Sequence, residues 1–226
     1  MKNAVIFDLD GLLIDSEIIS YQLYRDLTGK YGKHMTLEDY IHHYCGKTSE
    51  INMRTVIDEY HLPISAEEGL LFTDLKEKEY FKQGVNLKEG AVELLSYLKR
   101  NQYKILLASS STQERAIGVL HQNGIAAFFD HMVFGSEVKR GKPYPDIFIK
   151  ACEYAEEPPE NCLVLEDSEA GIQAACSAGI EVICIPDMRV PGDKFRKMET
   201  AELPSLKEVI DWLENNGQKS SSNKDQ

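Results

Sequence analysis

The sequence predicts an α/β protein with a doubly wound, Rossmann-like parallel sheet and a helical domain inserted after the first strand. Two observations predict this fold. Short, continuously apolar runs alternate with helical patterns over most of the chain, as is typical of strands that are buried on both faces of a sheet. From about residue 16 to about residue 83, by contrast, helical patterns follow one another without a buried strand, and this segment is too long for a loop.

The apolar runs place the strands, and the patterns between them place the helices of the core. We expect strands at 4–7, 104–108, 132–134, 162–165 and 181–185. We expect helices at 87–101, 112–124, 145–155 and 169–179, and a terminal amphipathic helix at 205–216. Gly124 and Gly179 stand at the ends of two of these segments, where glycine commonly ends a helix.

The inserted segment contains its own helical patterns, at 17–32, 36–45, 49–60 and 65–81. We therefore expect a core domain made of residues 1–15 and 85–216 and an inserted helical domain made of residues 16–84. The last residues, 217–226, are polar and are expected to form a disordered tail.

Composition excludes several classes of function. The net charge of −12 argues against a nucleic-acid partner, and the chain lacks a run of 18 apolar residues that could cross a membrane. The first apolar run is too short for a signal peptide, and the five widely spread cysteines are typical of reduced thiols. We expect a soluble, cytoplasmic protein that is a monomer.

Acidic side chains directly follow two of the predicted strands. Asp8 and Asp10 follow the first strand, and Glu166 and Asp167 follow the fourth. The carboxyl ends of parallel strands meet at one edge of the sheet, where two carboxylates about 4 Å apart repel by roughly 4 kcal/mol at an effective dielectric constant near 20. A hard divalent cation with oxygen ligands removes that penalty, so we expect these four acids to bind Mg²⁺.

Other polar residues at the same edge are suited to phosphate chemistry. The Ser109 and Ser110 hydroxyl and N–H groups follow a strand at the start of a helix and are expected to bind phosphate oxygens. Lys142, in the proline-containing loop GKPYPD, is expected to neutralise developing charge. Asp8 is suited to attack phosphorus and form an aspartyl phosphate, with Asp10 as the general acid and base.

Taken together, these residues resemble the four motifs of the haloacid dehalogenase-like superfamily. The motifs are DLDG at 8–11, Ser109 after its strand, Lys142 in GKPYPD, and EDSEAG at 166–171. The inserted domain resembles the mobile helical cap of that family, and the chain is most similar to its β-phosphoglucomutase-like branch, which includes sugar-phosphate phosphatases. The resemblance implies a Mg²⁺-dependent phosphatase that acts on a small phosphorylated metabolite, such as a sugar phosphate or a nucleoside monophosphate.

Differences between this sequence and related enzymes argue against several other activities. Dehalogenases lack the second aspartate and phosphonatases replace it, so Asp10 argues against both. Ser20 and Ser49 stand where β-phosphoglucomutases carry a histidine and an arginine, so the phosphosugar mutase is kept as the alternative. A receiver-like signalling domain would not contain the large insert. Within the insert, Glu17 and Lys47 are the candidates for contact with the leaving group of the substrate.

Overall fold

The computed structural model describes residues 2–222, and within them the chain folds into two compact units. One unit contains the residues up to Ile14 and those from Asn86 onward, and the other is Asp15–Val85. Among the described residues, no helix is both long enough and apolar enough to cross a membrane.

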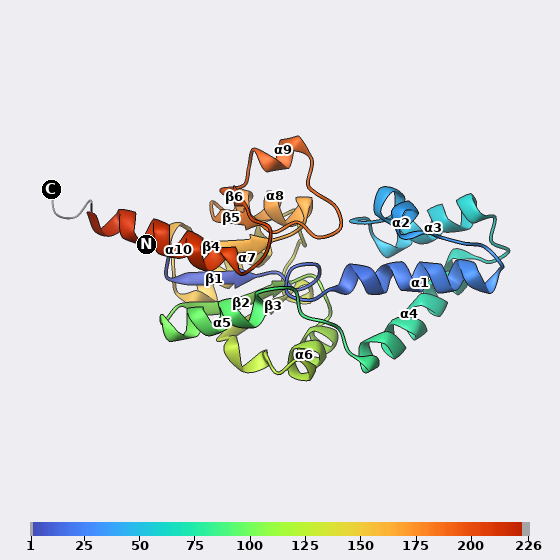
Figure 1. Cartoon of the computed structure of the whole chain (residues 1–226), viewed down its shortest axis with the longest axis horizontal. Helices are drawn as coiled ribbons and strands as arrows, with labels where there is room; N and C mark the ends of the chain where they lie inside the picture. Colours follow the sequence, from blue (N-terminus) through green and yellow to red (C-terminus); the bar gives the residue numbers. More distant parts are fainter. Residues whose placement is uncertain (1, 223–226) are drawn as a thin grey trace. The chain divides into compact units, whose positions relative to one another are not determined.

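The first unit is built on a parallel sheet that contains six strands within the described residues (Figure 1). The strand order is β3-β2-β1-β4-β5-β6. The bounds are β1 Ala4–Phe7, β2 Lys104–Ser109, β3 His131–Phe134, β4 Cys162–Glu166, β5 Glu181–Cys184 and β6 Ala201–Glu202. The predicted α/β fold class is confirmed. The sequence interpretation missed β6, because its two residues form no apolar run and are a strand only through their pairing with β5.

The helices of this unit are α5 Ala91–Arg100, α6 Gln113–Gln122, α7 Asp146–Ala155, α8 Glu169–Ser177, α9 Asp193–Arg196 and α10 Glu208–Ser222. Side-chain caps begin two of them. The Thr112 side chain accepts a hydrogen bond from the Arg115 N–H in α6, and the Ser168 side chain accepts one from the Gly171 N–H in α8. Helix α10 extends into the predicted disordered tail, whose residues 223–226 lie outside the described residues.

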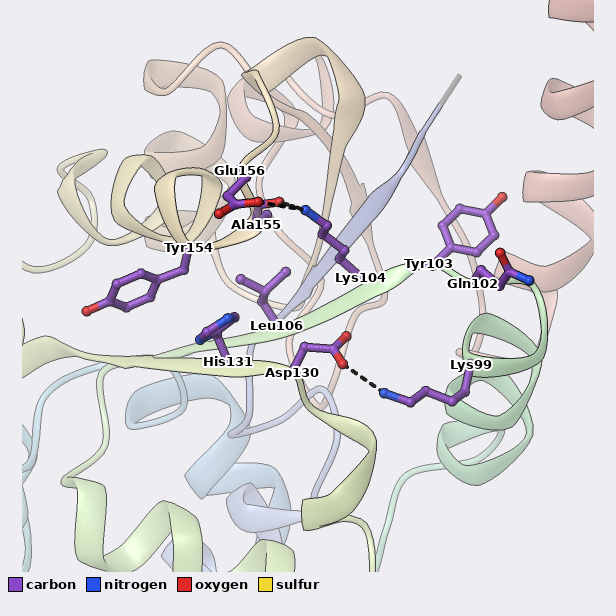
Figure 2. A pocket seen from close by; sticks show the side chains of 10 residues that line it. All are labelled: Lys99, Gln102, Tyr103, Lys104, Leu106, Asp130, His131, Tyr154, Ala155 and Glu156. Carbon is purple, nitrogen blue, oxygen red and sulfur yellow. Dashed lines mark hydrogen bonds and ion pairs between the residues drawn. The ribbon is translucent and has the colours of Figure 1, made fainter.

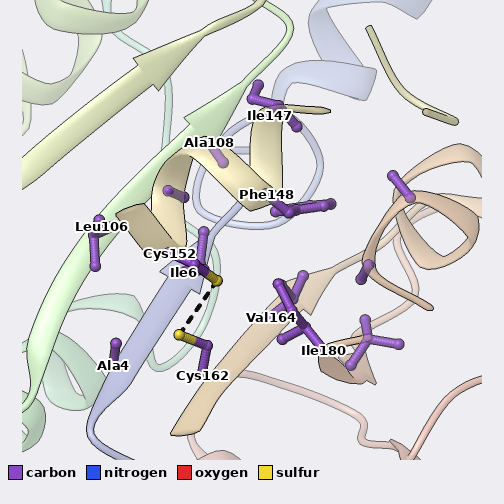
Figure 3. Close-up of a cluster of buried hydrophobic side chains, with 14 of the residues drawn as sticks. Ala4, Ile6, Leu106, Ala108, Ile147, Phe148, Cys152, Cys162, Val164 and Ile180 are labelled. Atoms are coloured by element: carbon purple, nitrogen blue, oxygen red, sulfur yellow. Dashed lines mark hydrogen bonds between the residues drawn. The ribbon is translucent and has the colours of Figure 1, made fainter. Parts of the chain in front are cut away.

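Helices cover both faces of the sheet. On one face, Ala4 and Ile6 of β1 pack in a buried apolar cluster with residues of α7 and α8, such as Phe148 (Figure 3). Successive side chains of a strand point to opposite faces, so Phe7 belongs to the other face, where its ring meets that of Phe129 edge-on at 6.1 Å. The continuous apolar runs of the sequence are therefore explained by burial on both sides.

Cysteines contribute to this core as apolar side chains. The Sγ atoms of Cys152 in α7 and Cys162 in β4 lie 3.4 Å apart inside the cluster (Figure 3). The five cysteines, all of them in the described part of the chain, are free thiols.

The second unit is helical, with α1 Ser16–Lys30, α2 Leu37–His43, α3 Ser49–Tyr60 and α4 Ala66–Gln83. Thr36 and Ser65 begin α2 and α4 with reciprocal capping boxes. Its interior contains a stack of tyrosine rings. The ring centroids of Tyr24, Tyr40 and Tyr44 lie 6.1–6.2 Å from one another.

Candidate active site

Neighbouring strands bring polar residues to one edge of the sheet. β1 lies between β2 and β4, and its last residue, Phe7, pairs with residues of both neighbours. One residue further along, Asp8 is level with Ala108 and Glu166, and its N–H donates to the Leu165 carbonyl at 3.1 Å. β2 and β3 lie on one side of β1 in the sheet, and β4, β5 and β6 lie on the other side. Ligands of doubly wound sheets bind at the carboxyl ends of the strands where the strand order changes direction in this way.

The ammonium group of Lys142 lies at this edge. Lys142 is in the loop before α7, and its side chain is only 6% exposed. Its Nζ donates to the Asp8 carboxylate, to Glu166 Oε1 at 2.6 Å and to the Ala108 carbonyl at 3.0 Å. Burial by itself would lower the pKa of Lys142, but the two carboxylates outweigh burial and raise it. The side chain is therefore a cation at neutral pH.

Glu166 is completely buried, and both of its carboxylate oxygens accept hydrogen bonds. Oε1 accepts from Lys142. Oε2 accepts from the backbone N–H groups of Asp167 and Ser168, each at 3.0 Å, and from the Ser168 hydroxyl at 2.9 Å. Glu166 therefore connects Lys142 to the segment that begins α8. Gly171 makes room for it, because a Cβ there would lie 1.9 Å from the Glu166 carboxylate.

Among the described residues, an acid cluster of Asp8, Glu166 and Asp167 is found at this edge, with one carboxylate oxygen of each within 4.8 Å of the others. Burial raises the pKa of Asp8 to about 7; the attraction of Lys142 opposes this, and the charges of Glu166 and Asp10 add to it. Burial also raises the pKa of Asp167 well above its ordinary value, and the Glu166 and Asp8 charges contribute. The cluster is therefore short of positive charge.

The chemistry of the acid cluster fits a hard cation. Two unit charges 4.8 Å apart repel by roughly 3.5 kcal/mol at an effective dielectric constant of 20, and one ammonium cannot balance three carboxylates. The atoms that the cluster offers to a metal ion are all carboxylate oxygens, and oxygen atoms are the ligands that Mg²⁺ and Ca²⁺ prefer. A divalent ion bound here would lower the pKa of Asp8 and Asp167 toward their ordinary range.

The space around Glu166 gives a testable prediction. Gly171→Ala is expected to lower the free energy of unfolding by about 1–3 kcal/mol, because the new methyl group overlaps the carboxylate that Lys142 and Ser168 hold in place. Urea denaturation measures the change. Gly118→Ala in α6 is the matched control, since its Cβ would meet no atom within 4 Å; it is expected to stabilise by up to about 1 kcal/mol. Equal effects of the two substitutions would contradict this account.

Asp10 faces a different partner, and its carboxylate is not part of the acid cluster found among the described residues. Arg115, in the first turn of α6, donates from Nη1 to Asp10 Oδ2 at 2.9 Å and from Nη2 to Oδ1 at 2.7 Å. The Ser111 hydroxyl donates to Oδ2 at 2.6 Å. Asp10, which the sequence predicts as acid and base and as a metal ligand, thus lies against a guanidinium and a hydroxyl group.

The predicted phosphate-binding serines lie at the end of β2. Ser109 is 1% exposed, and its Oγ accepts a hydrogen bond from the Ser111 N–H at 3.0 Å. Ser110, the next residue, is exposed. Their roles in phosphate binding stay predictions.

Glu17 and Lys47 belong to the helical unit. The Glu17 carboxylate accepts a hydrogen bond from the Tyr40 hydroxyl at 2.6 Å, and the Lys47 ammonium donates to the His43 carbonyl. Their predicted contact with a substrate stays a prediction.

The sequence interpretation missed two pairs near the site. Arg115 contacts Asp10, which is 105 residues away in the chain, and no local pattern of the sequence indicates this contact. Asp187 lies three residues after the end of β5, and it forms an ion pair with Lys88 at 2.5 Å.

A pocket of about 480 Å³ lies at the opposite edge of the sheet, by the first residues of β2 and β3 (Figure 2). Its charged groups are paired with one another: Lys99 contacts Asp130 at 2.8 Å, and Lys104 contacts Glu156 at 3.8 Å (Figure 2). The length of β2 separates this pocket from Ser109, so it plays no part in the site at the carboxyl ends of the strands.

Residues 5–185 match the model of the family described as haloacid dehalogenase-like hydrolase. The chain is 35% identical over 180 residues to a phosphorylated carbohydrates phosphatase of Thermotoga maritima, with 80% of this chain and 83% of that protein covered. It is 34% identical over 195 residues to a probable pseudouridine-5′-phosphatase of Drosophila melanogaster, with 84% of each chain covered.

Among solved structures, the fold is similar to that of a haloacid dehalogenase-like family hydrolase from Deinococcus radiodurans with bound phosphate and sodium. The TM-score is 0.84 at 26% identity, and 96% of each chain is covered.

Proposed function

Because this chain belongs to the haloacid dehalogenase-like hydrolase family, we propose that it is a phosphatase that hydrolyses a small phosphorylated metabolite through an aspartyl phosphate on Asp8. The observation that carries the proposal is the contact of Lys142 with both Asp8 and Glu166, beside Asp167, at the carboxyl edge of the sheet. A buried cation next to a buried carboxylate is suited to attack on a dianionic phosphate, because it offsets the repulsion between the two anions.

The first half of the proposed reaction transfers the phosphoryl group to the protein. An Asp8 oxygen attacks phosphorus, the bond between phosphorus and the leaving oxygen breaks, and Asp10 donates a proton to that oxygen. In the second half, a water oxygen forms a bond to phosphorus while Asp10 accepts a proton from that water and becomes the neutral acid again. The bond between the Asp8 oxygen and phosphorus breaks, and inorganic phosphate is released. Lys142, Ser109 and Ser110 bind the phosphate oxygens in both halves.

The acids of the site are proposed to hold Mg²⁺. Asp8 and Asp167 are the ligands that the acid cluster supports best, while both oxygens of Glu166 are already engaged, which favours a supporting role for that residue. Both carboxylate oxygens of Asp10 are engaged as well, by Arg115, so the place of Asp10 in the ligand set stays a prediction from the sequence. Bound Mg²⁺ would supply positive charge to the transferring phosphoryl group.

The substrate class rests on the relatives. One is named a phosphorylated carbohydrates phosphatase and another a probable pseudouridine-5′-phosphatase, so we propose a sugar phosphate or a nucleoside monophosphate as the substrate. In this proposal the helical unit Asp15–Val85 is the cap, and Glu17 and Lys47 contact the leaving group.

A phosphate-release screen tests the proposed function. With Mg²⁺ present, the protein is expected to release inorganic phosphate from at least one sugar phosphate or nucleoside monophosphate. EDTA is expected to lower the rate at least about 100-fold, and added Mg²⁺ to restore it, because the acid cluster lacks enough positive charge without the ion.

Two outcomes would contradict the proposal. Full activity in EDTA would exclude the metal role. Conversion of a sugar 1-phosphate to its 6-phosphate that depends on glucose 1,6-bisphosphate, without steady phosphate release, would favour the mutase.

A further inference from the structure

We propose that Arg115 is a positioning residue that, together with Ser111, holds the Asp10 carboxylate in the orientation needed for proton transfer at the leaving oxygen. This inference rests on the proposed phosphatase function. Arg115 meets both oxygens of Asp10, at 2.7 and 2.9 Å, and Ser111 meets one of them at 2.6 Å.

The position of Asp10 in the chain explains why it needs such support. It lies beyond the end of β1, next to Gly11, whose φ of +79° marks a sharp turn of the backbone. Its side chain is 34% exposed, so packing alone does not select one rotamer. A guanidinium is a planar fork that engages both carboxylate oxygens at once, which restricts the carboxylate in rotation as well as in distance.

Arg115 is itself held on a regular element. Its backbone N–H donates to the Thr112 side chain that caps α6, and its Nη1 contacts the Ser111 hydroxyl one turn earlier. Since α6 is a helix of ten residues, the fork is attached to a rigid support and not to the loop that carries Asp10. Residues on rigid elements hold a functional group more accurately than residues on loops do.

Ser111 extends the arrangement toward the predicted phosphate site. Its hydroxyl contacts Asp10, and its N–H donates to Ser109 Oγ at 3.0 Å. The orientation of the proposed acid is thereby linked to Ser109 at the end of β2. Both terminal nitrogens of Arg115 donate to Asp10, and this contact is the one through which Arg115 is proposed to act.

A comparison of two leaving groups tests the role. p-Nitrophenolate leaves without a proton, whereas an alkoxide needs one, so accurate placement of the acid matters only for the alkyl phosphate. We would measure kcat/KM, which reports phosphoryl transfer to Asp8, on p-nitrophenyl phosphate and on the best alkyl phosphate of the phosphate-release screen. Each variant is measured at its own pH of maximal rate, because the guanidinium also favours the ionised form of the Asp10 carboxyl group. Arg115→Met is expected to lose about 100-fold on the alkyl phosphate and less than about 5-fold on p-nitrophenyl phosphate. Arg115→Lys, which keeps the charge but lacks the fork, is expected to lie between these limits.

Arg196→Met is the matched control. Arg196 forms a similar two-nitrogen contact with Glu202, at 3.0 and 3.2 Å, at the end of β6, which β5 separates from β4 and its acids. The expected result is wild-type kcat/KM on both substrates. Circular dichroism checks folding, and if Arg115→Met does not fold, the same substrate ratio is measured with Arg115→Lys.

The outcomes separate this inference from the proposed function. Unchanged kcat/KM in the Arg115 variants, or an equal loss on both substrates, would overturn the positioning role while the wild-type protein still hydrolyses phosphate esters. Absence of phosphate release by the wild-type protein from every substrate would overturn the proposed function and this role with it.

Discussion

Asp8→Asn is expected to lower phosphate release at least about 10⁴-fold, because an amide cannot form the proposed acyl phosphate, and removal of a covalent nucleophile elsewhere costs on the order of 10⁶ in kcat. Asparagine has nearly the same size and shape, so the fold is expected to persist. The rate is measured as inorganic phosphate released in the presence of Mg²⁺, with the best substrate of the phosphate-release screen.

The stability of the same variant provides a second measurement, made without metal. Burial raises the pKa of Asp8 from 3.8 to about 7, so between these values the folded state holds a proton that the unfolded state has released. The contribution of Asp8 to the free energy of unfolding therefore falls as the pH rises from about 4 to about 7. Asp8→Asn is expected to remove this slope.

Asp211→Asn is the matched control, because Asp211 is an exposed aspartate on α10 of the same unit. It is expected to keep the wild-type rate and the wild-type dependence of stability on pH. An Asp8→Asn protein that retained more than about 1% of the wild-type rate would exclude Asp8 as the nucleophile.

Lys142→Met is expected to affect both stability and turnover. Removal of a buried cation leaves the buried carboxylates of Asp8 and Glu166 facing each other, and breaking a buried pair in this way costs about 3–5 kcal/mol. Urea denaturation at pH 7 measures this loss. Turnover is expected to fall at least about 10²-fold, since a charge that would stabilise the transferring phosphoryl group is gone.

A second lysine–glutamate pair supplies the comparison. Lys150 in α7 contacts Glu137 at 3.0 Å, but these side chains are 26% and 31% exposed, against 6% and 1% for Lys142 and Glu166. Solvent screens such a pair, so Lys150→Met is expected to change the free energy of unfolding by less than about 1 kcal/mol. Equal losses in the two variants would show that the Lys142 cluster does not depend on burial.

The elements of the core could be predicted because their signals are local in the sequence. The apolar runs at 4–7, 104–108 and 162–165 fall on β1, β2 and β4, since strands buried on both faces need apolar side chains at every position. β6 could not be predicted, because Ala201 and Glu202 become a strand only by pairing with β5. The extension of α10 into the polar tail was missed for a related reason, since composition alone does not indicate where a helix ends.

Part of the candidate site could be predicted by the same logic. Asp8 and Asp167 directly follow strands and Glu166 ends one, and parallel strands end at a common edge, so their proximity follows from the order of the elements. The partner of Asp10 could not be predicted from the sequence. Arg115 is 105 residues away in the chain, and nothing local to either residue indicates that the two meet.

The sequence by itself determined the α/β fold and the edge of the sheet at which acids gather. The order of apolar and polar residues along the chain shows where each strand lies and which residues come at its carboxyl end. Only the tertiary structure decided which charges contact each other: Lys142 between Asp8 and Glu166, and Arg115 on Asp10. Side-chain pairing depends on distances of a few ångströms between distant segments. Those distances are set by how the helices pack on the sheet, and a one-dimensional pattern does not contain them.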